Sequence, residues 1–85
     1  MEPIPATTET ERTEDVKRQC DQIIYRAARL MVEGNGASVP LMLDRLLSFA
    51  AAQATATDGK MRAAEAFREM ACRIEAGATE RKAMQ

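Results

Sequence analysis

The spacing of the apolar residues is the feature that most constrains this chain. In three segments they recur at steps of three and four residues, which places them on one face of an α-helix. Breaks that contain glycine separate the segments, at 34–36 and at Gly59. No segment alternates polar and apolar residues as a half-buried strand does. The sequence therefore predicts an all-α fold, a small three-helix bundle with helices over residues 13–33, 39–57 and 59–77.

The first predicted helix, residues 13–33, carries a stripe that we expect to face the core. Thr13 is the expected N-cap, because its hydroxyl can accept a hydrogen bond from the first turn. Cys20 lies in the middle of the stripe and is most simply a small core residue. The stripe consists of Val16, Cys20, Ile23, Ile24, Ala27, Leu30 and Met31.

The second and third predicted helices have their own start signals. Ser38 is the expected N-cap of residues 39–57, with Pro40 in the first turn, where its missing N–H costs nothing. The apolar face of this helix spans about 160°, more than one neighbouring helix covers. Thr57 or Asp58 is expected to cap residues 59–77. The candidate dimer or partner face on the second helix is Met42, Leu43, Leu46, Leu47 and Phe49.

The two ends of the chain differ in composition from the middle. Residues 1–12 contain two prolines and three glutamates, lack an apolar period, and are expected to form a disordered acidic tail. Gly77 interrupts the third apolar stripe, so residues 79–85 are expected to fray. These boundaries place the folded domain at residues 13–78.

Large apolar side chains are scarce in this chain. The hydrophobic fraction is 46%, but alanine supplies 16 of those residues. Alanine favours helix and close helix contact, yet it adds little volume to a core. A domain of this size is also marginal, since it buries only about 60% of its unfolded surface. We therefore expect the chain to gain stability from a protein partner, first of all a second copy in a homodimer.

The polar side of the first helix offers a second candidate partner-binding site. Tyr25, the only tyrosine, lies roughly opposite the apolar stripe. Tyrosine and arginine are the side chains that interface hot spots favour. A surface tyrosine covered by arginine stems would have the same composition. The candidate residues are Arg18, Gln22, Tyr25, Arg29 and Val32.

Several kinds of chemistry find no support in the sequence. The chain has no histidine, the usual general base near neutral pH, and its two cysteines match no zinc spacing. No catalytic residues, metal site or cofactor are therefore predicted, and the chain is not expected to be an enzyme or to bind a small-molecule substrate. The N-terminus lacks a signal-peptide pattern, and no apolar run is long enough for a membrane span. A cytoplasmic protein is expected.

Three functions remain open from the sequence. The favoured one is a non-catalytic helical protein–protein interaction module, of the kind found in small bacterial accessory or regulatory proteins. The second is a small inhibitor, of a phage or mobile-element type, that binds a host enzyme. The third is a helix-turn-helix-like DNA-binding regulator, but the bases and acids of the third helix share one surface, which makes nucleic acid an unlikely partner. These residues are Lys60, Arg62, Arg68 and Arg73 beside Glu65, Glu69 and Glu75.

Overall fold

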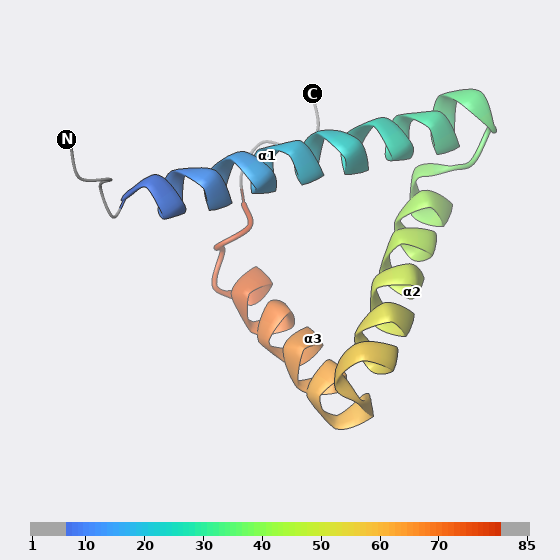
Figure 1. Ribbon diagram of the computed structural model, residues 1–85. Coiled ribbons are helices and arrows are strands. Elements are labelled where there is room, and N and C mark those ends of the chain that lie inside the picture. Colours follow the sequence, from blue (N-terminus) through green and yellow to red (C-terminus); the bar gives the residue numbers. More distant parts are fainter. Residues whose placement is uncertain (1–6, 81–85) are drawn as a thin grey trace. The chain divides into compact units, whose positions relative to one another are not determined.

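The computed structural model describes residues 7–80. Within that range all regular structure is helical, which confirms the predicted all-α fold with three helices (Figure 1). The chain divides into two units, Met1–Ala37 and Ser38–Gln85. The first unit contains helix α1 and the π-helical turn η1, and the second contains helices α2 and α3. The elements are α1 (Thr7–Arg29), η1 (Leu30–Gly34), α2 (Val39–Asp58) and α3 (Lys60–Glu75).

Helix α1 begins at Thr7, so part of the segment expected to be disordered is helical. Thr13 is not an N-cap, because its hydroxyl donates a hydrogen bond of 3.0 Å to the carbonyl oxygen of Glu9 inside the helix. The prediction judged residues 7–12 by the surface they could bury. Each residue added to an existing helix gains a backbone hydrogen bond, so the helix can extend without burying apolar surface. Glu9 in the first turn also interacts favourably with the helix dipole. Residues 1–6 of the predicted tail lie outside the described residues.

The C-terminal end of the first helical segment widens into the π-helical turn η1. The Asn35 amide donates to the Leu30 carbonyl at 3.0 Å, and the Ala37 amide donates to the Met31 carbonyl at 2.9 Å. Gly36 has a φ of 78°, which lets the chain leave the helix while the last carbonyls keep their partners. The predicted helix end near Glu33 is therefore close to the observed one, but the wider last turn was not predicted.

Helix α2 starts at the predicted cap. The Ser38 hydroxyl oxygen accepts a hydrogen bond of 3.2 Å from the Leu41 amide, and Pro40 lies in the first turn. The helix runs to Asp58, one residue beyond the predicted end. Near its end, the Thr57 hydroxyl donates to the Gln53 carbonyl at 2.8 Å, which ties this side chain to α2 itself.

A single glycine joins α2 to α3 in a helical hairpin. Gly59 has φ 87° and ψ 157°, a backbone conformation that is essentially limited to glycine. Gly59 is also the N-cap residue of α3, with no side-chain hydrogen bond. The expectation that Thr57 or Asp58 caps α3 is therefore wrong, because both residues still belong to α2. The sharp turn needs a positive φ directly before α3, and neither threonine nor aspartate supplies it readily.

Helix α3 ends at Glu75, two residues before the predicted end. Gly77 has a φ of 84°, and the Ala78 amide donates to the Arg73 carbonyl at 2.9 Å. Together with the bond from the Gly77 amide to the Ile74 carbonyl, this is a Schellman motif, which stops a helix and satisfies its last carbonyls. Of the segment predicted to fray, residues 81–85 lie outside the described residues.

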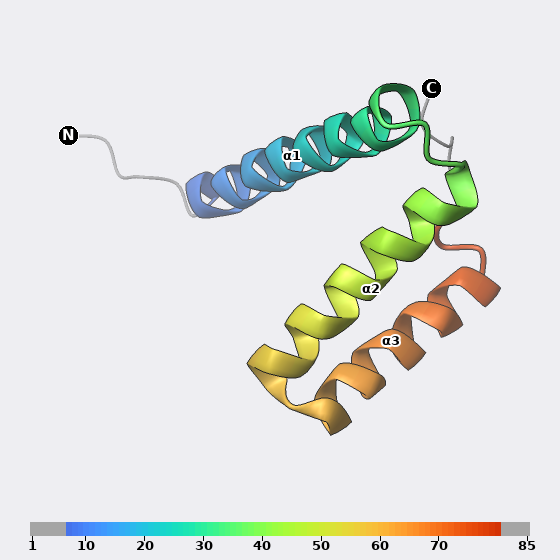
Figure 2. The ribbon, with the colours of Figure 1, turned by 90° about the vertical axis from the view of Figure 1, so that its right-hand side faces the viewer.

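The hairpin of α2 and α3 is closed at its turn and opens away from it. In Figure 2 the two helices run alongside each other, and in Figure 1 they diverge from the turn at Gly59. Exposure along the apolar stripe of α3 follows this shape. It rises from 5% at Ala63 near the turn to 36% at Phe67, 42% at Met70 and 55% at Ile74. Along α3, the apolar stripe is therefore covered only close to the turn, whereas Met42, in the first turn of α2, is buried.

Candidate interaction surfaces

The apolar stripe predicted for the first helix, from Val16 to Met31 and called the α1 stripe below, is largely exposed. Val16 is 50% exposed, Ile23 62% and Leu30 63%. The expectation that Cys20 is a core residue is wrong, because its side chain is exposed as well. A single helix cannot cover its own apolar face, and residues 7–37, the described part of the first unit, contain no second α-helix. The α1 stripe is therefore an apolar surface of its unit that another helix could cover.

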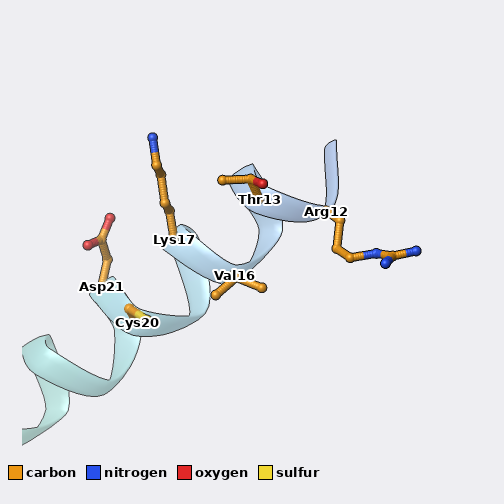
Figure 3. A pocket seen from close by; sticks show the side chains of 6 residues that line it. All are labelled: Arg12, Thr13, Val16, Lys17, Cys20 and Asp21. Carbon is orange, nitrogen blue, oxygen red and sulfur yellow. The ribbon is translucent and has the colours of Figure 1, made fainter. Parts of the chain in front are cut away.

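A shallow hollow lies on this stripe near the N-terminal half of α1. Figure 3 shows the six side chains that line it, all from nearly three turns of the helix. Val16 and Cys20 belong to the α1 stripe, Thr13 lies one turn before Val16, and charged side chains lie beside them. The charged side chains are Arg12, Lys17 and Asp21.

The structure brings together Tyr25 and Arg29 from the second candidate site. The Arg29 guanidinium carbon lies 5.7 Å from the centre of the half-buried Tyr25 ring, within the range of a cation–π contact. Arg29 also donates to the Glu33 carboxylate at 3.2 Å. This hydrogen bond, together with the negative charge of Glu33, raises the pKa of Arg29, and Tyr25 adds to the same direction. Arg29 is thus held between two neighbours on its own helix.

The other three residues of that site have different surroundings. Arg18 forms an ion pair with Asp15, and Gln22 is exposed one turn before Tyr25. Val32 is half-buried in η1 and is not among the residues around the hollow beside the tyrosine. Glu33 and Arg26 line that hollow in its place, and sequence reasoning missed both. The signal for Glu33 was present, since it lies four residues after Arg29, the spacing of a helical ion pair. The hollow is lined by Tyr25, Arg26, Arg29, Leu30, Glu33 and Gly34.

The candidate face of α2 separates into a covered and an open part. Met42 is only 3% exposed and Leu46 is half-buried, so these two belong to the covered part. Leu43, Leu47 and Phe49 are exposed. The prediction treated all five as one docking face, but the buried side chain of Met42 is not available to a partner. Three of the five candidates therefore remain on an open surface.

The outer face of α3 mixes charges of both signs. A hollow there is lined by two acidic and two basic side chains of α3, by Asp58 before it, and by Ala66 and Cys72. Phosphate binding requires a clustered basic face, since each carboxylate beside it repels the nucleic acid backbone. This arrangement gives no concentration of positive charge. The four charged residues of α3 are Arg62, Glu65, Arg68 and Glu69.

Within residues 7–80 no group of three or more acidic, cysteine or histidine side chains is placed to hold a metal ion. Within the same range no helix is both long and apolar enough to cross a bilayer. Cys20 and Cys72 are exposed and form no disulfide.

Comparison with known proteins adds no relative to this picture. No protein-family model, no curated protein and no solved structure matches the chain. A function must therefore be argued from the exposed surfaces themselves.

Proposed function

We propose that this chain is a non-catalytic helical interaction module whose first partner is a second copy of itself. The exposed apolar side chains are the single observation that supports this proposal most. In the described part of the chain, the buried hydrophobic residues are Ala28, Met42 and Ala63, and two of these are alanine. Among the same residues, thirteen large hydrophobic side chains are at least 36% exposed. Association removes such surface from water, at a gain of about 25 cal/mol per Å².

The exposed apolar residues are grouped by element, which suits docking of whole helices. Helix α1 offers Val16, Ile23 and Ile24 on its stripe, and η1 adds Leu30. Helix α2 offers Leu43 and Leu47 one turn apart, with Phe49 on the other side of Met42 and Leu46. Exposed apolar side chains grouped on the surface of a small protein are typical of sites of protein contact. A homodimer is the simplest assembly that covers them, because most soluble oligomers are symmetric dimers.

The two other functions have weaker support. An inhibitor that binds a host enzyme through the Tyr25 surface would use Arg18 and Arg29, but each is already paired with a carboxylate of the same unit. A DNA-binding regulator would need a basic surface on α3, where acids and bases alternate. Apolar self-association therefore accounts for more of the exposed surface than either alternative.

Sedimentation equilibrium of the purified chain tests the proposal. We expect the chain to dimerise reversibly at protein concentrations between about 1 µM and 100 µM, which corresponds to the association free energy of a modest apolar interface. Raising the salt concentration should leave the dimer intact, because apolar burial is not screened by ions as charge contacts are. A monomer throughout this range would contradict the proposal, and dissociation by salt would contradict its apolar basis.

A further inference from the structure

Six positions, five on α1 and the sixth at the first residue of η1, form a regular seam. Thr13, Val16, Cys20, Ile23, Ala27 and Leu30 follow one another at alternating steps of three and four residues. This is the spacing with which two helices pack along a shared line, each side chain inserting between four residues of the other helix. No charged residue occupies the seam between its first and last members. We refer to these six positions as the α1 seam.

Side-chain size alternates along the α1 seam. The large residues Val16, Ile23 and Leu30 recur every seven residues, and the small residues Thr13, Cys20 and Ala27 stand between them at the same interval. A facing helix must therefore bring large side chains opposite the small ones to fill the space evenly. The side-chain sizes along the seam therefore restrict which helix can pack against it.

The structure leaves the α1 seam open and already hollowed. All six side chains are exposed. Half-buried Tyr25, Met31 and Val32 and buried Ala28 lie outside the seam. The hollow in Figure 3 includes Thr13, Val16, Lys17 and Cys20, which stand at positions i, i+3, i+4 and i+7. Four residues at this spacing form the hole that receives one side chain of a facing helix.

We propose that the α1 seam packs antiparallel against the α1 seam of a second copy of this chain. This inference rests on the proposed self-association and names its contact. The antiparallel arrangement places Thr13 opposite Leu30 of the second copy, Val16 opposite Ala27, and Cys20 opposite Ile23. Every layer then pairs one small with one large side chain, so the spacing between the two helices stays even along the seam.

A parallel arrangement fits the same residues poorly. It would place Ala27 opposite Ala27 of the second copy and Leu30 opposite Leu30. Layers of two small side chains would leave voids, and the layers of two large ones beside them would hold the helices apart. The size pattern therefore selects the antiparallel orientation.

The charges next to the seam favour the same orientation. Parallel helices would bring Arg12 close to Lys17 of the second copy, a like-charge contact that occurs twice in a symmetric dimer. Antiparallel helices set Lys17 beside the apolar Ile24 of the second copy and so avoid this contact. The existing ion pair of Lys17 with Glu14, at 3.5 Å, lies at the margin of the seam and leaves it clear.

Cross-linking through Cys20 tests the contact and its direction. Antiparallel packing puts the two copies of Cys20 about 4.5 Å apart along the helix axis, at the centre of the dimer. The full-length Cys72→Ser variant should therefore give a covalent dimer with a short bismaleimide. The variant Thr13→Cys, with Cys20→Ser and Cys72→Ser, should stay monomeric on a denaturing gel, because its thiols are about 25 Å apart along the axis. Gln22→Cys in that same background is the matched control, at the height of Cys20 but on the other face of α1.

Each result of these experiments decides between arrangements. Cross-linking at both Cys20 and Thr13→Cys would show parallel packing and overturn the proposed direction. Failure of Cys20 to cross-link, in a chain that sediments as a dimer, would overturn the inference and leave the proposed self-association standing. A chain that sediments as a monomer would overturn both.

A pair of charge substitutions measures the contribution of the seam. Ile23→Asp puts two carboxylates at the centre of the dimer and should raise its dissociation constant by at least about a hundredfold. Ile23 is 62% exposed, so the helix content in circular dichroism should change little. Gln22→Asp adds the same charge one residue away and off the seam, and should change the dissociation constant by less than about threefold. Equal effects of the two substitutions would contradict a contact along the seam.

Discussion

At the scale of single residues, neighbouring glycines in this chain do different work. Gly36 has a positive φ and open space around the position of a Cβ atom. Gly34 lies in the helical turn η1, where a Cβ atom would come within 2.7 Å of the Leu30 Cδ1 atom. Position 36 requires glycine because its φ is positive. At position 34 an added Cβ atom would meet only the end of the exposed, flexible Leu30 side chain, so a larger residue can be accommodated there.

We therefore expect opposite outcomes from two alanine substitutions in this turn. Gly36→Ala should lower the free energy of unfolding by about 1–2 kcal/mol, because an L-residue with a side chain is strained at this φ. Gly34→Ala should leave stability unchanged or raise it by up to about 1 kcal/mol, through the higher helix propensity of alanine. Urea unfolding followed by circular dichroism measures both values. A larger loss for Gly34→Ala than for Gly36→Ala would refute this assignment.

At the scale of elements, the start of α2 depends on one hydroxyl. The Ser38 side chain satisfies the Leu41 amide, which has no carbonyl partner within the helix. The first turn of α2 carries no acidic residue, so no carboxylate there favours the helix dipole. The start of α3 has no side-chain cap and relies on the backbone of Gly59. The two helices of the hairpin therefore begin by different means.

Removing the cap of α2 should have a measurable cost. Ser38→Ala should lower the free energy of unfolding by about 1 kcal/mol, because the Leu41 amide loses its acceptor. Ser48→Ala is the matched control, since it makes the same chemical change inside α2, where alanine is the better helix former. Thermal unfolding of the two variants gives the comparison. A control that loses as much stability as Ser38→Ala would show that the cap is not responsible.

At the scale of the whole molecule, the chain exposes more large apolar residues than it buries. No side chain in the described part of the chain falls below 2% exposure. A small domain with so little core has a small margin of stability. Association adds its own free energy to that margin, because only the folded chain presents the apolar faces. Folding and dimer formation are therefore expected to be coupled.

This coupling should make thermal stability depend on protein concentration. Above the dissociation constant, each tenfold rise in concentration should stabilise the folded dimer by about 1.4 kcal/mol. The midpoint of thermal unfolding should therefore rise steadily with concentration. Calorimetry over two decades of concentration measures the shift, with Ile23→Asp as the comparison that should show little dependence. A midpoint of the unsubstituted chain that stays constant would count against coupled folding and association.

The sequence by itself determined the helices, because their signals are local. Each local signal lies within a few residues of the structure that it specifies. These signals are the three apolar periods, the cap at Ser38 and the breaks at 34–36 and Gly59. The pairing of Tyr25 with Arg29 also follows from a spacing of four residues on one helix. The start of α1 was misjudged, since burial was used to decide a boundary that backbone hydrogen bonds alone can extend.

Only the tertiary structure decided which apolar residues are covered. Periodicity identifies the apolar face of α2, which spans about 160°, more than the stripe of about 100° that one helix contact needs. It does not say which part of that face a neighbouring helix covers. The structure covers Met42 and leaves Leu43 and Leu47 exposed. It also opens the hairpin away from Gly59, so Ile74 is exposed although it shares a stripe with buried Ala63. The spacing of residues in the sequence determines on which side of a helix each residue lies. Whether that residue is buried depends on where a second helix lies.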